Sequence, residues 1–421
     1  MKNKKQIFLS EITAHIKSKE AREYVTKELD FHLTQGKKGW MEKGIDEAEA
    51  EEKAIEQMGS PIELGRQFNK IHRPRVDWLS IILLVTTLCL GFLPLFPLDY
   101  MEEGHFITYK IVFTLLGSLI AIALMLVNYK KFIKLGWFFY TLGILLLLSI
   151  CFFSNSLIGG LPVLRIGPIT LESLMAVPFF FFAWASFFHN SKLKVWHFFL
   201  LFFISTYLFL IANSIATTYI YVVMVISMLG WSKFNRKTIY IIWGSMIIFL
   251  FILAELAWRY MPLYLKDRIL GFLNPEKYAT GAGYPYLYSK EFIYNAGWFG
   301  NSTGSEFIPE AHTNFVFVTF TYYYGWVFSM ILVFILSLFV ARIVVVFHQI
   351  NDTYGKLLLV GAVTLYAVQL FSNIGMVFGI FPMTSMSLPF ISYGLLPTLF
   401  NAILIGIVLS VYRRKSMVTS R

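Results

Sequence analysis

The chain has 421 residues, of which 57% are hydrophobic, 18% aromatic and only 14% charged, and its formal net charge is +11. This composition lies far outside the average for soluble domains and excludes a soluble globule. The charge is unevenly spread, because residues 1–76 contain 15 of the 36 Lys and Arg residues and 13 of the 25 Asp and Glu residues. The sequence therefore predicts an all-α polytopic membrane protein, with a small soluble helical domain at 1–76 and a membrane domain at 77–421.

The amino-terminal head is charged and helical in pattern. Residues 10–35 carry apolar residues at helical intervals, which predicts one or two amphipathic helices. Asp46 can cap a further helix, and Gly59 before Pro61 is a typical helix end. The stretch from His32 to Pro61 resembles the HAAS-like helical prefix domain of several Gram-positive membrane proteins. That resemblance implies a regulatory or docking role, and a helical bundle that merely precedes the membrane is the alternative.

Ten apolar runs follow the head, each close to the roughly 20 residues that a helix needs to cross the hydrocarbon. They lie at 78–97, 109–127, 133–153, 171–188, 195–212, 214–230, 238–261, 313–341, 357–379 and 390–411. No cleavable signal peptide is expected before them, so the first run should stay in the membrane as an anchor. We therefore expect about ten transmembrane helices.

The basic residues predict the orientation of these spans. Arg73 and Arg75 directly precede the first run. Lys and Arg recur in four short segments between later runs, at 128–134, 189–194, 231–237 and 342–356. Because positively charged loops stay in the cytoplasm, both termini are predicted to be cytoplasmic. The basic excess therefore reflects topology, and no nucleic-acid surface is predicted.

One outward segment, at 262–312, is too long for a simple connection. Loops of this length are usually functional or disordered, and its many Tyr, Phe and Trp residues argue against disorder. We expect a large extracytoplasmic loop that forms an ordered cap at the outer membrane surface.

Few residues of the membrane domain could carry chemistry. Cys89 and Cys151 lie in apolar runs without metal-ligand or redox spacing, so we expect buried apolar thiols. No cluster of His, Cys and acidic residues has ligand spacing, so no metal site is predicted. Ionisable residues in or beside a span are costly and are therefore functional candidates. Glu172 is one such residue, whereas Glu255 and Arg259 are four residues apart and favour an intrahelical ion pair.

The strongest candidate group is Glu310, His312 and Asn314, at the entry to the eighth span. It places an acid, an imidazole and an amide where both a lipid-borne headgroup and water can reach. The surrounding string, Pro309-Glu-Ala-His-Thr-Asn-Phe-Val-Phe317, resembles the P-E-x-H-[ST]-D-F-[IV]-F motif of the SEDS family, the FtsW/RodA/SpoVE proteins of shape, elongation, division and sporulation.

Further motifs support that resemblance, which covers residues 77–415. The family's outward loop and glycine-rich stretch resemble residues 268–275, 281–284 and 297–304, and its carboxy-terminal signature resembles residues 369–376, 381–384 and Leu388-Pro-Phe-Ile-Ser-Tyr-Gly394. The last run is highly specific to the family.

The resemblance implies an enzyme of peptidoglycan synthesis in the cytoplasmic membrane. Such proteins polymerise lipid II, an undecaprenyl-diphosphate-linked precursor, into glycan strands on the outer face of that membrane. They work beside a class B penicillin-binding protein, a transpeptidase. Lipid II, this transpeptidase and membrane lipids are therefore the expected partners.

The resemblance also implies roles for individual residues. A carboxylate near the reacting sugars can act as base for the acceptor 4-hydroxyl, so Glu310, His312 and Asn314 are the candidate catalytic residues. The candidate substrate-binding residues are Lys266, Arg268, Gly283, Tyr284, Pro389, Ser392 and Tyr393. Lys266 and Arg268 could equally bind interfacial lipid phosphate, and Pro389 and Tyr393 could simply shape a helix entry. The sequence identifies no certain cofactor and leaves the use of a divalent cation open; such an ion would be held mainly by the diphosphate of the substrate.

Several positions depart from the family pattern. Asn314 stands where the family has Asp, and an amide cannot accept a proton as a carboxylate can. The family's Asp-Leu-Gly-Thr stretch corresponds here to Ser214-Ile-Ala-Thr217, and its Glu-Glu-x-Gly run to Tyr322-Tyr-Tyr-Gly-Trp326. These losses affect one predicted catalytic surface.

Two interpretations stay open. In the first, the chain is a lipid II glycosyltransferase in which Glu310 or His312 acts as base, or Asn314 only positions the acceptor. In the second, it is a catalytically degenerate scaffold that binds lipid II or a class B transpeptidase. A third class, a transporter of lipid-linked precursors, would need internal repeats or broken helices with polar pairs, and neither is evident.

Overall fold

The computed structural model describes residues 4–97, 103–158, 161–167, 169–260, 263–301, 307–383 and 386–416. The chain divides into two compact units, Met1–Asp77 with Tyr412–Arg421, and Trp78–Val411. The first unit ends one residue beyond the predicted domain boundary. It also contains the carboxy-terminal tail, whereas the sequence predicts a membrane domain that extends to residue 421.

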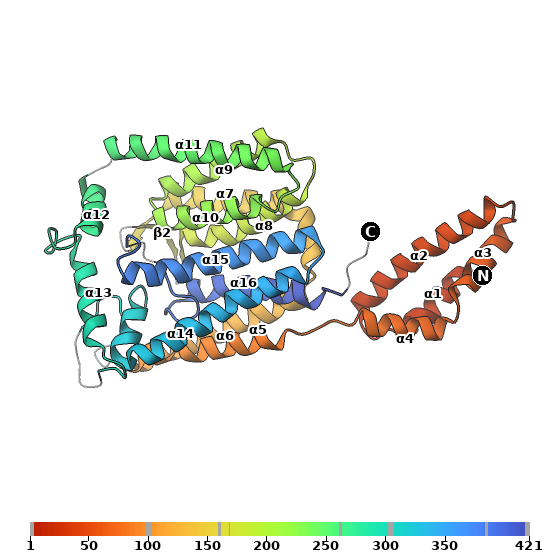
Figure 1. Cartoon of the computed structure of the whole chain (residues 1–421), viewed down its shortest axis with the longest axis horizontal. Helices are drawn as coiled ribbons and strands as arrows, with labels where there is room; N and C mark the ends of the chain where they lie inside the picture. The colour runs from red at the N-terminus through yellow and green to blue at the C-terminus, as the bar shows by residue number, and fades with distance from the viewer. Residues whose placement is uncertain are drawn as a thin grey trace. The chain divides into compact units, whose positions relative to one another are not determined.

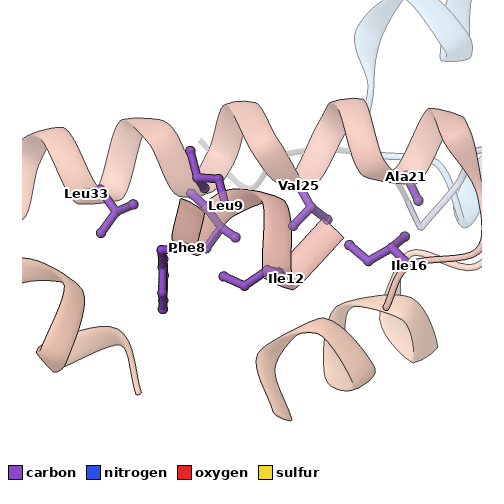
Figure 2. Packing of buried hydrophobic residues seen from close by; sticks show 8 residues of the cluster. Phe8, Leu9, Ile12, Ile16, Ala21, Val25 and Leu33 are labelled. Carbon is purple, nitrogen blue, oxygen red and sulfur yellow. The ribbon is translucent and has the colours of Figure 1, made fainter. Parts of the chain in front are cut away.

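The first unit is a bundle of short helices (Figure 1). They are α1 (Lys4–Ala14), α2 (Lys19–Met41), α3 (Glu47–Met58) and α4 (Pro61–Ile71). Helix α1 packs against α2 and α4, and α2 packs against α3. Figure 2 shows Phe8, Leu9 and Ile12 of α1 beside Val25 and Leu33 of α2, where all five are buried. Burial of these apolar faces stabilises helices that would be marginal in isolation.

The predicted helix signals at Asp46 and Gly59 are present in the head, together with a cap at Ser18 that was not expected from the sequence. Ser18 separates α1 from α2 and accepts a hydrogen bond from the amide of Ala21, so residues 10–35 span two helices. Asp46 accepts a hydrogen bond from the amide of Ala48 at 3.3 Å. Gly59 ends α3 with a φ of 84°, which favours glycine.

A buried arginine holds the carboxy-terminal tail within the first unit. The side chain of Arg414 is 2% exposed, and its guanidinium donates to both carboxylate oxygens of Glu20, at 2.9 and 2.7 Å. The amide of Arg75 donates to the carbonyl of Arg413 at 3.1 Å. A two-point Arg–carboxylate pair fixes geometry as well as charge, so residues 412–416 are held within this unit.

Replacing Glu20 with Gln should loosen the tail, because it leaves the buried Arg414 charge facing a neutral partner. We expect trypsin to cleave after Arg414 several-fold faster in full-length Glu20→Gln than in wild type. Glu52→Gln is the matched control, because it removes the exposed Lys4–Glu52 pair, with side chains 69% and 56% exposed. Equal cleavage rates in wild type and Glu20→Gln would show that the ion pair does not hold the tail.

The second unit is a bundle of apolar helices (Figure 1). Its helices are α5 (Trp78–Leu90), α6 (Glu103–Leu126), α7 (Gly136–Phe153), α8 (Ala176–His189), α9 (Val195–Ile211), α10 (Ile215–Leu229), α11 (Arg236–Tyr260), α12 (Leu263–Leu273), α13 (Tyr284–Asn295), α14 (Val316–His348), α15 (Thr353–Val377) and α16 (Leu395–Arg413). Short 3₁₀ turns lie at Leu93–Leu95, Tyr129–Leu135 and Ser173–Met175. Each of the ten predicted runs coincides with one of these helices.

Six helical segments of the described residues are long and apolar enough to cross a membrane. Helices α9 and α10, and the segment Ser173–His189 that contains α8, are apolar but shorter. The crossing of all ten helices therefore stays a prediction. Helix α15 packs against α8, α10 and α14, and α8 is buried on nearly every face. A helix that is hydrophobic all round belongs in the centre of a bundle.

The long segment after α11 contains α12 and α13, which lie across one end of the bundle (Figure 1). Residues 262 and 302–306 of the predicted loop lie outside the described part of the chain. The placement of this segment at the outer membrane surface stays a prediction.

A small antiparallel sheet joins α7 to α8 and was not expected from the sequence. Strand β2 (Leu161–Ile166) pairs with both β1 (Ser156–Ile158) and β3 (Ile169–Leu171). The Gly-Gly and Gly-Pro pairs at 159–160 and 167–168 are turn signals that could have indicated it. The sequence predicts only a loop between the third and fourth apolar runs, and the strands lie almost entirely in it.

Two predictions about side chains in the spans are wrong. Cys89 is exposed on the protein surface and Cys151 is partly exposed. An apolar residue in a membrane helix can face lipid, so an apolar run does not predict burial within the protein. Glu255 and Arg259, both described and exposed on α11, form no ion pair with each other. Spacing alone brings such residues within reach but does not fix their rotamers.

Helix α14 is broken at Gly325, where φ is 85° and ψ is 173°. The loop 297–301 fills the break: the amide of Asn301 donates to the carbonyl of Tyr322 at 2.8 Å, and the amide of Trp326 donates to the carbonyl of Gly297 at 3.1 Å. Freed backbone groups in an apolar region must find such partners. A broken helix is therefore present, contrary to the expectation from sequence, and a buried side-chain pair spans the break, because the Ser329 hydroxyl donates to the Thr321 hydroxyl at 2.9 Å.

Gly325→Ala should destabilise the second unit. A Cβ at this position would lie 2.4 Å from the amide nitrogen of Gly300, and the backbone conformation alone costs a non-glycine residue about 1–3 kcal/mol. Thermal unfolding in detergent should show a lower midpoint for this variant. Gly244→Ala on α11 is the control, because a Cβ there meets nothing within 4 Å; equal midpoints for the two variants would contradict the packing argument.

Candidate active site

The segment that carries the predicted catalytic residues is a tight turn before α14. The amides of Thr313 and Phe315 both donate to the carbonyl of Glu310, at 3.0 and 3.2 Å. Glu310 itself has a φ of +50°, which is uncommon for a residue with a side chain. Such a conformation persists only where its surroundings enforce it.

Three consecutive carbonyls of this turn are held from other elements. The amide of Tyr393 donates to the carbonyl of His312 at 2.7 Å. The hydroxyl of Ser392 donates to the carbonyl of Thr313 at 2.8 Å. The side-chain amide of Asn373, buried on α15, donates to the carbonyl of Asn314 at 3.0 Å. The backbone of the predicted catalytic motif is therefore fixed by α15 and by the turn that precedes α16.

Glu310 and Asn314 meet at a cavity of about 270 Å³. The side-chain amide of Asn314 donates to the carboxylate of Glu310. Arg268 of α12 and Tyr284 of α13 line the same cavity, together with Pro285, Tyr288, Pro309, Phe315, Met376 and Met383. The tertiary structure thus brings an acid, an amide and a guanidinium to one mainly apolar pocket, the usual character of a ligand site.

His312 lies apart from this pair. Its ring packs against Phe106 of α6 and Tyr393, with centroids 5.3 and 5.5 Å apart, and it is not among the residues that line the cavity. Burial lowers the pKa of His312 below its usual value, although the nearby Glu310 charge opposes this shift. The imidazole is therefore neutral near pH 7.

The other predicted substrate-binding residues occupy three different places. Lys266 is half-buried on α12 and does not line the cavity. A Cβ at Gly283 would lie 2.2 Å from the carbonyl oxygen of Pro275, so this glycine permits a close backbone approach. Pro389 and Ser392 are buried in the turn before α16, and Tyr393 is half-buried there. Ser392 and Tyr393 donate hydrogen bonds to the backbone of the predicted catalytic motif, and neither of them lines the cavity.

A second, larger cavity of about 800 Å³ lies on another face of α13. Phe272, Ile293, Trp326 and Phe378 supply apolar walls, and charged residues at its lining include Lys277 and Lys290. It shares no lining residue with the first cavity. Tyr286 lines this cavity and accepts a hydrogen bond from the amide of Met383, which lines the first. Helix α13 therefore separates two candidate binding spaces.

Sequence reasoning missed one buried charge close to the site, Lys110 on α6. Its side chain is fully buried, and its Nζ donates to the carbonyls of residues 390, 391 and 392. A lysine inside an apolar run was itself a signal. No group of three or more His, Cys, Asp or Glu residues able to hold a metal ion was found among the residues that the structure describes.

Comparisons with known proteins agree on one family. The family profile described as "Cell cycle protein", FTSW_RODA_SPOVE, matches residues 77–417. Peptidoglycan glycosyltransferase MrdB of Escherichia coli K12 is 29% identical over 197 residues, which are 41% of this chain and 53% of that protein. Stage V sporulation protein E of Bacillus subtilis is 29% identical over 155 residues, 36% of this chain and 42% of the relative. The matched region thus spans about half the length of these curated relatives, or less.

Two solved structures have a similar fold. A chain from a study titled "Structural coordination of polymerization and crosslinking by a peptidoglycan synthase complex" has a TM-score of 0.69 at 22% identity, with coverage of 81% of this chain and 98% of that one. Rod shape determining protein RodA of Thermus thermophilus has a TM-score of 0.60 at 20% identity, with coverage of 80% and 97%. At these identities the likeness shows the fold of an integral membrane protein.

Proposed function

This chain belongs to the FtsW/RodA/SpoVE family of cell cycle proteins, and from that premise we propose that it polymerises lipid II into glycan strands. The observation that supports this proposal most directly is the Glu310–Asn314 pair at a cavity that also contains Arg268. In this proposal Glu310, which the family motif also has, takes over as base from the aspartate that the motif has at position 314 and this chain lacks. The names of the relatives, which include peptidoglycan glycosyltransferases, point to the same reaction.

In the proposed reaction the acceptor 4-hydroxyl attacks the anomeric carbon of the donor sugar. The new carbon–oxygen bond forms as the bond to the undecaprenyl diphosphate breaks, with inversion, and the hydroxyl proton passes to the Glu310 carboxylate. The Asn314 amide occupies one oxygen of that carboxylate and so orients it. Arg268 supplies positive charge toward the departing diphosphate. A divalent cation, if the reaction uses one, would be held mainly by the diphosphate.

The two cavities suit a reaction that joins two lipid-linked molecules. The smaller contains the proposed base, and the larger combines apolar walls with Lys277 and Lys290. A polymerase of this kind must bind a donor and an acceptor together, so that their reacting atoms are held close. We place one lipid II molecule or growing strand on each side of α13.

Glu310→Ala should abolish polymerisation, with a loss of about 10²–10⁴-fold, the usual contribution of a general base. The measurement is glycan-strand formation from lipid II by the purified chain, alone and with its class B transpeptidase. Glu291→Ala is the matched control, because this carboxylate is exposed on α13, next to the site, but lines neither cavity.

His312→Phe should keep most activity in the same assay, since the ring lies off the cavity and packs against aromatic neighbours.

Unchanged polymerisation by Glu310→Ala would remove Glu310 from the mechanism.

A non-catalytic scaffold is the second candidate function, and Asn314 is the observation that favours it. An amide cannot take up the proton that the family's aspartate can. A wild-type chain that binds lipid II or the transpeptidase but forms no strands, alone or in the complex, would establish this alternative.

We place the chain in the cytoplasmic membrane with both termini inside and α12 and α13 outside. In a background without Cys89 and Cys151, a membrane-impermeant maleimide applied to intact cells should label Glu276→Cys, in the turn after α12, and not Lys131→Cys, before α7. Permeabilised cells should label both, since both positions are exposed. Labelling of Lys131→Cys in intact cells would reverse the orientation.

A further inference from the structure

Lys110 is a positively charged residue that the proposed reaction does not use. Its side chain is buried among the apolar helices of the second unit. It lies on α6 with 0% exposure. Its Nζ donates to the carbonyls of Phe390, Ile391 and Ser392 at 3.1, 3.1 and 3.0 Å. An ammonium has three donors and no acceptor, so these three carbonyls match it completely. A neutral amine would leave one of the three carbonyls without its donor.

The turn that receives this ammonium is shaped to do so. Phe390 has a φ of +63°, and the amide of Leu388 donates to the hydroxyl of Ser392 at 2.8 Å. This conformation turns three successive carbonyls toward one point. Buried carbonyls that converge without a donor between them repel one another and stay unsatisfied. The turn therefore depends on a cation at this point.

The same turn holds the catalytic motif. Beyond the carbonyls that bind Lys110, the Ser392 hydroxyl donates to the carbonyl of Thr313 and the Tyr393 amide donates to the carbonyl of His312. These two acceptors directly precede Asn314. A continuous series of bonds thus runs from Lys110 through residues 390–393 to the backbone that carries the Glu310–Asn314 pair.

Helix α6 supports this series with two aromatic side chains on the face that carries Lys110. The ring of Phe106, four residues before Lys110, lies 5.3 Å from His312 and 5.2 Å from Tyr393. The ring of Phe113, three residues after it, lies 5.7 Å from Tyr393. Spacings of three and four residues place these side chains together on one helix face. The His312 ring is thus part of the support of the motif.

We propose that Lys110 is a positioning residue: its ammonium fixes the turn 388–393, and that turn fixes residues 312–314 so that Glu310 and Asn314 meet at the cavity. This inference rests on the proposed function for its catalytic meaning, but the bond series can be tested without it. The ammonium acts through the three hydrogen bonds that it donates. An apolar side chain of equal length would fill the space and supply no donor. Arginine is no substitute, since a Cβ at Gly91 would already lie 3.3 Å from Nζ and the space is confined.

The test is amide hydrogen exchange of the full-length protein in lipid nanodiscs. In Lys110→Met, we expect peptides that contain the amides of Tyr393, Thr313 and Phe315 to exchange at least about tenfold faster than in wild type. The reason is that local opening at these amides then requires less free energy. Thr114→Val is the matched control. It alters a buried hydroxyl one turn along the same helix that has no hydrogen-bond partner, and it should leave these peptides unchanged.

A second variant keeps the test decisive if Lys110→Met does not fold. Ser392→Ala retains Lys110 but removes the hydroxyl that joins the turn to Thr313. It should speed exchange at 313–315 more than at 390–391. Wild-type exchange at 313–315 and 388–396 in a folded Lys110→Met protein, or at 313–315 in Ser392→Ala, would overturn the proposal.

Kinetics separate positioning from simple support of the fold. If wild type polymerises lipid II, Lys110→Met should lower the turnover number by about tenfold or more while the KM for lipid II changes little, since the substrate-contacting residues are retained. A rise in KM alone would overturn the positioning role. A silent wild type would refute the proposed function, whereas the exchange result would still decide whether Lys110 holds the motif.

Discussion

Irregular backbone inside an apolar bundle is stable only where every buried amide and carbonyl has a partner. The irregular segments around the site satisfy this requirement in two separate groups. The loop 297–301 fills the break in α14. Ser392 and Tyr393 bond to the carbonyls of the turn before α14, and Lys110 donates to the turn before α16. The geometry of the proposed catalytic turn depends on the second group of bonds more than on any single helix.

This dependence explains how a site of few ionisable groups is organised. The catalytic turn has an uncommon backbone conformation at Glu310, and its carbonyls are held at three successive positions. Rigid support of this kind pre-organises a carboxylate without further charged neighbours. In the proposed function, Asn314 orients the Glu310 carboxylate, and this carboxylate serves as base where the family motif has an aspartate at position 314.

Much of the fold could be predicted because its signals are local. Apolar length identified the helices of the second unit other than α12 and α13, and Asp46 and Gly59 delimit a helix of the head. The small sheet between α7 and α8 was not predicted, because its strands have only three to six residues and lie in a short loop between two apolar runs. The membership of the tail in the first unit was missed because Arg414 and Glu20 are 394 residues apart in sequence.

The sequence by itself determined the membrane class of this protein, the positions of its ten apolar helices, its family and the identity of the Glu310–Asn314 group. These properties follow from composition, periodicity and a short contiguous motif. Only the tertiary structure decided that Arg268 and Tyr284 share a cavity with this group, that His312 does not, and that Lys110 belongs to the site. The shared cavity and the Lys110 hydrogen bonds join residues that are tens to hundreds of positions apart in sequence. Such contacts are set by how the helices pack, and no local sequence pattern reports that packing.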